Sequence, residues 1–261
     1  MPIPPHVLRF WRSLDELFAS VRTTPWGAVV TDGRFPRIWD ANYARIDLPV
    51  EALTLAEVEA ALLPALADAG AEAFHVVSFH AEATTRLLTE LSSRGHRLTW
   101  DLAMDLGPAA TPAAERPVAV RELPDDDALW DAVASSFSLF GIQPDEAVAQ
   151  LRTIERDVLA PGGKRWFGVD GDDGRPACLG ALLVLDDVGY VDNVATRPEA
   201  RGRGYASAVT ARIVREARRA GVAHVWLLVD PDDTPVVRLY ERLGFRPAGM
   251  LGSTRGPLPG P

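Results

Sequence analysis

The residues with the clearest chemical meaning form the hexapeptide Arg-Gly-Arg-Gly-Tyr-Ala at positions 201–206. An apolar run precedes it, and the pattern after it predicts a helix. Two glycines let a backbone turn tightly and approach a ligand without a Cβ in the way. The first amides of a helix have no intrahelical partner and favour an anion. The hexapeptide therefore predicts a phosphate-binding loop.

Three readings compete for this loop. A dinucleotide loop would use Gly202, Gly204 and Ser207 between a strand and a helix, with Asp230 ending the next strand. However, a dinucleotide-binding turn leaves its strand directly, whereas residues 196–200 intervene here, and too few residues follow for the usual sheet. A nucleotide P-loop is excluded, because the sequence has no Gly-Lys-Ser/Thr. A glycine turn before a surface helix, with solvated arginines, is the simplest alternative.

A longer pattern around the loop resembles a known family. Residues 194–206, Val-Ala-Thr-Arg-Pro-Glu-Ala-Arg-Gly-Arg-Gly-Tyr-Ala, resemble the acetyl-CoA loop of the GNAT N-acetyltransferase superfamily, whose core is Arg/Gln-x-x-Gly-x-Gly/Ala. Residues 233–245, Asp-Thr-Pro-Val-Val-Arg-Leu-Tyr-Glu-Arg-Leu-Gly-Phe, look like its second element, usually Asn-x-x-Ala-x-x-Leu-Tyr-x-x-x-Gly-Phe. The two elements have the expected order and spacing, and together they are highly specific. The resemblance covers residues 188–250.

The resemblance implies that acetyl-CoA binds here as a co-substrate. Its pyrophosphate would lie on the loop amides, and its pantetheine arm would pair with the preceding strand like an added strand. The residues that the resemblance assigns to the cofactor are Val194, Ala195, Thr196, Arg201, Gly202, Arg203, Gly204, Tyr205, Ala206, Asp233 and Tyr240. No metal is expected, since the five histidines show no metal-ligand spacing and the single cysteine, Cys178, lies in an apolar run.

Two catalytic residues are implied in the same way. Tyr240 occupies the usual general-acid position of the family, where a phenol donates a proton to the leaving thiolate. It would otherwise be a packing residue on an amphipathic helix. Asp192 lies where many relatives carry an acidic residue facing the acceptor, so it is the candidate general base; otherwise it is a strand carboxylate bonded to nearby backbone. Asn193 alternates to the other face of the strand, so both side chains cannot point at the substrate.

The second element departs from the family pattern at two positions. Asp233 replaces the usual Asn, and Val236 replaces the usual Ala. An ionised Asp cannot donate hydrogen bonds, and it adds negative charge beside an anionic cofactor. We expect Asp233 to cap the helix that begins near Pro235.

The elements around these residues form an α/β (α+β) pattern in two halves. When the two halves are compared at a constant offset of 149 residues, residues 75–77 (His-Val-Val) align with residues 224–226 (His-Val-Trp). Either this echo is a coincidence between two ordinary β-α-β pieces, or the chain holds two tandem GNAT-like domains. We expect the second, with each domain a mixed, mostly antiparallel sheet flanked by helices around a central parallel splayed pair. Residues 52–55, Ala-Leu-Thr-Leu, replace the arginine-glycine loop in the first half, which predicts one cofactor site.

The predicted boundaries follow from this pattern. They are a degenerate GNAT-like N-terminal domain at 1–106, a proline-rich linker at 107–117, a GNAT N-acetyltransferase domain at 118–252 and a loose tail at 253–261. An apolar content of 47% and a charged content of 24% are typical of a core-forming protein, and a net charge of −9 argues against extensive nucleic-acid binding. Without a signal-peptide pattern or a membrane-spanning apolar run, we expect a cytoplasmic protein with no membrane partner and with a homodimer as one open option. The tandem arrangement resembles that of two-domain GNAT proteins of bacteria, which implies a bacterial protein.

We therefore expect an enzyme that transfers an acetyl group from acetyl-CoA to a primary amine of a small molecule or peptide by direct attack. The acceptor would bind against the helices within residues 125–158 and the loop at residues 137–143. The alternative is a non-catalytic acyl-CoA-binding protein with a role in regulation or assembly.

Overall fold

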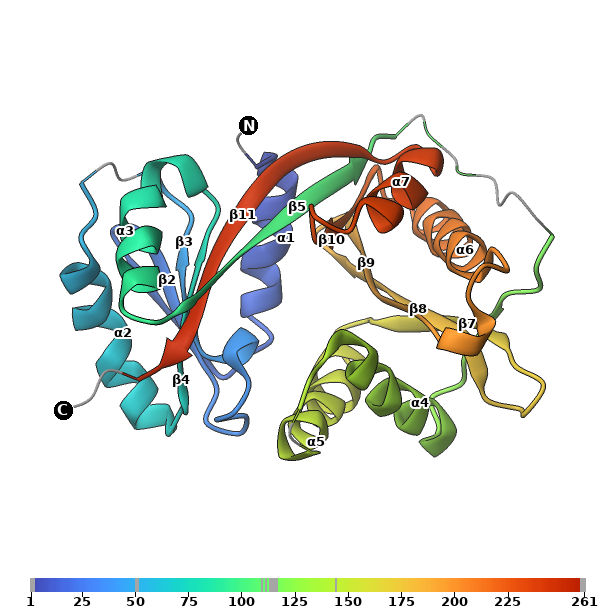
Figure 1. The fold of residues 1–261 in the computed structure, drawn as a ribbon, viewed down its shortest axis with the longest axis horizontal. Coiled ribbons are helices and arrows are strands. Elements are labelled where there is room, and N and C mark those ends of the chain that lie inside the picture. Colours follow the sequence, from blue (N-terminus) through green and yellow to red (C-terminus); the bar gives the residue numbers. More distant parts are fainter. Residues whose placement is uncertain are drawn as a thin grey trace. The chain divides into compact units, whose positions relative to one another are not determined.

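Two stretches of the chain repeat one order of elements, as the echo between the halves predicts (Figure 1). The computed structural model describes residues 3–49, 52–108, 110, 112, 117–143 and 145–258. The first stretch contains α1 (Pro5–Asp15), β1 (Ser20–Thr24), β2 (Gly27–Thr31), η1 (Trp39–Ala41), β3 (Tyr43–Ile46), α2 (Leu55–Ala69), β4 (Ala73–Ser78), α3 (Ala81–Ser93) and β5 (Arg97–Leu106). The second contains β6 (Arg121–Glu122), α4 (Asp127–Phe137), η2 (Ser138–Phe140), α5 (Asp145–Ile154), η3 (Glu155–Leu159), β7 (Arg165–Asp170), β8 (Pro176–Leu185), β9 (Val188–Thr196), η4 (Pro198–Ala200), α6 (Tyr205–Arg219), β10 (His224–Val229), α7 (Thr234–Arg242) and β11 (Arg246–Pro257).

The chain divides into two compact units, and the boundaries fall inside β5 and β11. Unit 1 comprises Met1–Ala103 and Ala248–Pro261, and unit 2 comprises Met104–Pro247. Residues 248–252, which the sequence assigns to the second domain, thus group with the first unit. The predicted linker at residues 107–117 falls in unit 2, and its positions 109, 111 and 113–116 lie outside the described residues.

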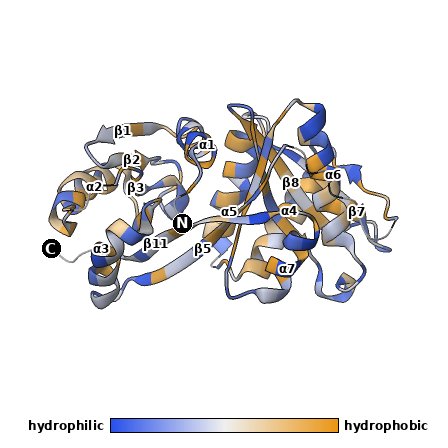
Figure 2. Cartoon of the chain, turned by 90° about the horizontal axis from the view of Figure 1, so that it is seen from above, coloured by the Kyte–Doolittle hydropathy of each residue, from blue (hydrophilic) through white to orange (hydrophobic). Residues whose placement is uncertain are grey.

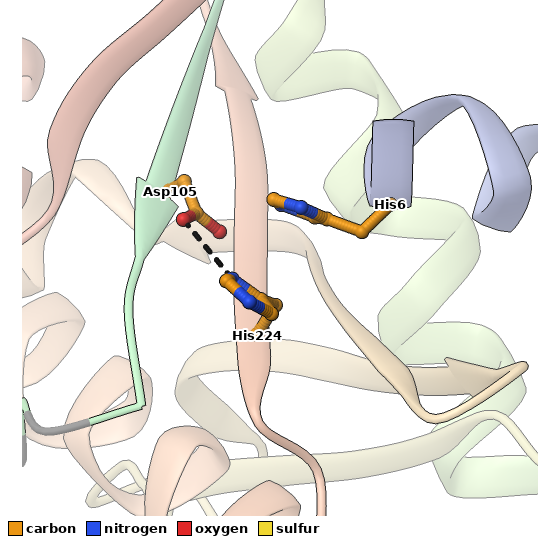
Figure 3. A group of neighbouring side chains, drawn as sticks. All are labelled: His6, Asp105 and His224. Carbon is orange, nitrogen blue, oxygen red and sulfur yellow. Dashed lines mark hydrogen bonds and ion pairs between the residues drawn. The ribbon is translucent and has the colours of Figure 1, made fainter. Parts of the chain in front are cut away.

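The last strands of the two stretches, β5 and β11, each contribute residues to both units. In unit 1 the strand order is β1-β2-β3-β4-β11-β5, and β11 pairs antiparallel with β4 from Gly252↔Ser78 to Pro257↔Ala73. In unit 2 the order is β5-β10-β9-β8-β7-β6. There the carboxylate of Asp105, near the end of β5, lies 3.3 Å from Nδ1 of His224, the first residue of β10 (Figure 3).

Both sheets match the predicted fold class. Each is mostly antiparallel and contains one parallel pair, β3 with β4 in unit 1 and β9 with β10 in unit 2. The helices cover the sheets through amphipathic faces. In α6, Val209, Ile213 and Val214 recur at helical spacing and are fully buried, whereas the last turn carries Arg218 and Arg219. The helix therefore shows both hydrophobic and hydrophilic residues (Figure 2). No described helix combines the length and the apolar composition needed to cross a bilayer.

The structure departs from the predicted loose tail at residues 253–261. Residues 253–257 continue β11 and pair with β4, and Thr254 is fully buried. There is no room for a side chain at position 256, where a Cβ on Gly256 would lie 2.6 Å from the ring of His96. Composition therefore suggested a tail where the chain forms a packed strand. Residues 259–261 lie outside the described residues.

Replacing Gly256 by alanine should accordingly destabilise the protein by about 1–3 kcal/mol, because the added methyl group overpacks the ring of His96. Urea unfolding followed by circular dichroism measures this loss. Leu258→Ala, at an exposed side chain just beyond the strand, is the matched control and should change stability by less than about 0.5 kcal/mol. Equal midpoints for the two variants would mean that this segment does not contribute to folding.

Candidate functional site

The parallel pair of unit 2 opens into a splay. Strand β9 runs from Val188 to Thr196, but it pairs with β10 only from Val188 to Tyr190, opposite His224 to Trp226. The remaining residues of β9 therefore have no β10 partner, and their edge is available to an extended ligand. In unit 1 the corresponding pair is closed, because β3 and β4 pair through to Ile46↔Ser78 and the Phe79 N–H then donates to the Ile46 carbonyl at 2.9 Å.

The arginine-glycine loop leads from the splay into α6. Both of its glycines adopt left-handed conformations, with φ of 74° at Gly202 and 81° at Gly204. Such values favour glycine because a Cβ would be strained there. Gly204 is the N-cap of α6, and the helix has no side-chain cap and no acidic residue in its first turn. Its first amides are therefore available to an anion.

Helix α2, the counterpart of α6 in unit 1, has a different N-terminus. The Thr54 hydroxyl accepts a hydrogen bond from the Glu57 N–H at 3.3 Å, and the Glu57 carboxylate accepts one from the Thr54 N–H at 2.9 Å. This capping box satisfies the amides internally and puts a carboxylate where α6 is open. Together with the closed β3–β4 pair, it supports the prediction of one cofactor site, in unit 2.

A cavity of about 680 Å³ joins the splay, the loop and α7. It is of the size that small-molecule sites have. Of the predicted cofactor residues, all of which the structure describes, ten line it: Val194, Ala195, Thr196, Arg201, Gly202, Gly204, Tyr205, Ala206, Asp233 and Tyr240. Arg203 does not; its guanidinium instead lies 3.5 Å from the Glu199 carbonyl. A free strand edge, an uncapped helix N-terminus and the Arg201 guanidinium are the groups that would hold the pantetheine arm and pyrophosphate of acetyl-CoA.

Tyr240 projects from α7 into the wall of this cavity. Its side chain is almost fully buried, and its ring packs edge-on against Phe245 with centroids 5.8 Å apart. Burial raises the pKa of the Tyr240 phenol well above its usual range, and the neighbouring Cys178 and Asp192 raise it further. The phenol therefore stays protonated at neutral pH and can act as a proton donor. It is both a packing residue, as the alternative reading expects, and a wall of the cavity.

Asp192 lies on β9 at a bulge. Its Oδ1 accepts a hydrogen bond from the Asn193 N–H at 2.8 Å, and its Oδ2 accepts one from the Lys164 ammonium at 2.6 Å. The side chain remains 27% exposed, so the carboxylate can still meet a ligand. The hydrogen bond from the Asn193 N–H agrees with the alternative interpretation of Asp192 as a strand carboxylate bonded to nearby backbone. The exposed part of the side chain is compatible with the role of general base, which stays a prediction.

The expectation that Asn193 faces away from Asp192 is wrong. Asn193 adopts a left-handed conformation with φ of 50°, and the β8–β9 register shifts between Leu179 and Ala181. An extra residue in one strand breaks the alternation of side chains. The Asn193 amide thus lies 3.4 Å from the Glu155 carboxylate, which also binds Lys164, so Asp192 and Asn193 reach one cluster.

Asp233 caps α7, as expected. Its carboxylate accepts a hydrogen bond from the Val236 N–H at 3.2 Å, and Pro235 lies in the first turn. Cys178 is buried, which agrees with its place in an apolar run: burial raises the pKa of Cys178 to about 11, so it is a neutral thiol rather than a nucleophile.

Loss of the cap should be measurable separately from loss of the charge. Asp233→Ala should cost about 1 kcal/mol of stability, whereas Asp233→Asn should retain most of it, because both Asp and Asn are good N-caps. The Asn variant also removes a negative charge from the cavity wall, so its affinity for acetyl-CoA should rise by a few fold. Thermal unfolding and calorimetric titration test the two effects. A weaker affinity in the Asn variant would contradict this assignment.

Lys164 and Glu155 are the site residues that sequence reasoning missed. Lys164 stands in a glycine-containing loop before β7, and Glu155 stands in a helical stretch of mixed polarity. Both positions are typical of exposed charges, yet both side chains are buried. The only available signal was the proximity of Lys164 to a buried strand.

Comparison with known proteins agrees with this geometry. Residues 127–245 match the model of the acetyltransferase (GNAT) family. A mycothiol acetyltransferase from Actinosynnema mirum is 30% identical over 200 residues, which cover 72% of this chain and 65% of that protein. The chain thus spans less than two thirds of the length of the curated relatives that it matches first.

Two solved structures share the fold over more than nine tenths of the chain. A functionally unknown conserved protein from Staphylococcus epidermidis superposes with a TM-score of 0.72 at 13% identity, covering 92% of this chain and 94% of that one. A tandem GNAT protein from the clavulanic acid biosynthesis pathway superposes with a TM-score of 0.56 at 13% identity, covering 100% and 99%. The two-domain arrangement predicted from the sequence is therefore found in solved proteins. The loop, the splay and the cavity all fall within residues 127–245, the part of the chain that matches the acetyltransferase (GNAT) family.

Proposed function

We propose that this protein transfers the acetyl group of acetyl-CoA to a primary amine, by direct attack of the amine on the thioester. The observation that carries the proposal is the single cavity that joins a free strand edge, an uncapped helix N-terminus and a protonated phenol. The first two features suit the pantetheine arm and the pyrophosphate. The phenol suits a leaving thiolate.

The chain's residues would act in a fixed order. Asp192 accepts a proton from the acceptor ammonium, directly or through water, which leaves the amine nitrogen with a free electron pair. That nitrogen attacks the thioester carbonyl carbon, the carbon–sulfur bond breaks, and the Tyr240 hydroxyl gives its proton to the departing sulfur. The acylated nitrogen then loses its extra proton through water to the Tyr240 phenolate, which leaves a neutral amide and a free thiol, and Asp192 returns its proton to solvent. Since the transfer is direct, no covalent bond to the protein forms, which agrees with the neutral state of the nearby Cys178 thiol.

The acceptor is proposed to lie beside the cavity, against α4 and the η2 segment. Leu139 and Phe140 of η2 line the cofactor cavity, and both are exposed hydrophobic residues. A second cavity of about 460 Å³, between α4 and β8, shares Leu139 and Ala195 with the first. Asp131 and Ser135 of α4 line it together with Arg175, before β8, and Arg197, after β9, so its lining is polar and of mixed charge. Asp192 is not among the lining residues of either cavity, so an amine bound there would pass its proton to Asp192 through water. The similarity to a mycothiol acetyltransferase makes an amine related to mycothiol the first acceptor to test.

The test is a thiol-release assay with acetyl-CoA and a panel of amines that includes mycothiol-related amines, other small amines and peptides. The products are identified by mass spectrometry. We expect one acceptor class to yield acetylated amine and free CoA in equal amounts. Tight binding of acetyl-CoA without transfer to any amine would favour the alternative, a non-catalytic acyl-CoA-binding protein.

A further inference from the structure

Behind Asp192 lies a buried ionic cluster that ordinary packing does not explain. The Lys164 ammonium lies 2.6 Å from Asp192 Oδ2 and 2.8 Å from the Glu155 carboxylate. The Lys164 side chain has no exposed surface, and that of Glu155 is 7% exposed. Of the three side chains, Asp192 is the one that opens toward solvent, at 27% exposure. The cluster is therefore closed at its lysine and glutamate and open at its aspartate.

Three elements that are distant in sequence build this cluster. Glu155 is the first residue of a π-helical turn that continues α5, and such turns occur frequently at functional sites. Lys164 immediately precedes β7; its N–H donates to the Leu159 carbonyl at 2.9 Å, and its ammonium lies 5.2 Å from the centre of the Trp166 ring. Asp192 comes from β9. A backbone hydrogen bond thus fixes the main chain of Lys164, and the Trp166 ring lies beside its ammonium.

The charges of the cluster do not cancel. Two carboxylates share one ammonium, so in their ionised forms they exceed it by one negative charge. Buried ion pairs are weak contributors to stability, because desolvation of the charges offsets their attraction. Burial, opposed by Lys164 and reinforced by Asp192, raises the pKa of Glu155, and the attraction of Asp192 and Glu155 outweighs burial and raises the pKa of Lys164. The lysine therefore stays charged.

We propose that Lys164 and Glu155 are positioning residues for Asp192, and that they set its affinity for a proton. This inference rests on the proposed acetyl transfer, in which Asp192 receives the proton of the amine. Lys164 holds Oδ2 while the Asn193 N–H holds Oδ1, so the carboxylate has one orientation. Glu155 binds the same ammonium and so reduces the positive charge that Asp192 experiences.

The other titratable groups near Asp192 do not perform this role. Tyr240 approaches from α7, and its raised pKa keeps it neutral near pH 7. Among the described residues, Lys164 is the charged group that contacts Asp192 directly, and Glu155 acts on Asp192 through the ammonium that the two carboxylates share. Their effects on Asp192 should have opposite signs.

Two substitutions test the expected directions of these effects on the proton affinity of Asp192. Lys164→Met leaves two carboxylates together, so Asp192 binds its proton more tightly, and the acid limb of the kcat/KM profile should move up by about one pH unit. Glu155→Gln leaves the whole charge of Lys164 to Asp192, so the acid limb should move down by about one pH unit. Lys164→Arg, which retains the charge, should return the limb toward its original position.

The experiment measures pH–rate profiles of the full-length protein and of these three variants. Carboxyl carbon-13 NMR titration of Asp192 in the same proteins reports the same two directions without substrate, and Asp192→Asn assigns the signal. Opposite shifts support the proposal. The proposal would be overturned if the acid limb of the kcat/KM profile shifted in the same direction in Lys164→Met and Glu155→Gln. It would also be overturned if both variants lowered kcat and left the acid limb unchanged. If Lys164→Met does not fold, the downward shift in Glu155→Gln decides alone.

Failure of this inference can be told apart from failure of the proposed function. A protein that transfers acetyl groups but shows limbs independent of both variants contradicts the inference only. A protein that transfers none, although the Asp192 signal shifts in opposite directions in the two variants, contradicts the proposed function and leaves the positioning of Asp192 established.

Discussion

Replacing Tyr240 by phenylalanine should lower kcat by about 10²- to 10⁴-fold, while the Kd of acetyl-CoA stays within about twofold. The substitution removes the one hydroxyl that can donate to the sulfur from α7, and it retains the ring that packs against Phe245. Because the pKa of the phenol is raised, its proton is present throughout the neutral range in the native protein. Steady-state kinetics with the acceptor found in the amine panel, combined with calorimetry, measures both quantities.

Tyr190→Phe is the matched control, because Tyr190 lies on β9, one strand of the splayed pair, and its ring packs against Trp226 with ring centroids 4.4 Å apart. It should reduce kcat by less than about threefold, since its hydroxyl lies outside the lining of the cofactor cavity. An unchanged kcat in Tyr240→Phe would remove Tyr240 from the chemistry. A joint loss of kcat and of cofactor affinity would instead assign it a binding role.

A second large effect is expected at the N-cap of α6. Gly204→Asp should raise the Kd of acetyl-CoA by about 30- to 100-fold, because a carboxylate there repels the phosphates that the helix N-terminus attracts. Asp tolerates left-handed backbone better than most residues, so the fold should lose no more than about 2 kcal/mol of stability. The variant would therefore lose binding without losing structure, which calorimetry and thermal unfolding can show together.

Gly204→Asn separates charge from shape. Asn has nearly the same size as Asp and tolerates the same φ of 81°, but it carries no charge. Its Kd should rise by less than about tenfold. Equal losses in the Asp and Asn variants would mean that the side chain blocks the loop sterically. No loss in either variant would place the phosphates elsewhere.

Much of the candidate site could be predicted from the sequence because its parts are local. The glycines of the loop need left-handed backbone, the helix after them needs its amides satisfied, and Asp233 stands directly before a proline that begins a helix. Each of these requirements is written in a few consecutive residues. The prediction that residues 52–55 lack such a loop was local too, and the capping box at Thr54 and Glu57 gives it a structural cause.

The remaining features depend on contacts between distant segments. The burial of Lys164 and Glu155 follows from the convergence of three elements, and no local pattern distinguishes them from exposed charges. The bulge at Asn193 is set by the pairing of β9 with β8. The inclusion of β11 in the sheet of unit 1 is likewise a choice of partner, since an alternating or glycine-rich segment specifies that a strand can form but not which strand it joins.

The central claim, that unit 2 holds one acetyl-CoA site, is tested most directly by isothermal titration of the full-length protein with acetyl-CoA. We predict one molecule bound per chain, with the affinity strongly reduced in Gly204→Asp and largely retained in Gly204→Asn. Binding of two molecules per chain would contradict the closed state of the unit 1 site. Absence of binding at millimolar acetyl-CoA, or a preference for a dinucleotide over CoA, would contradict the account as a whole.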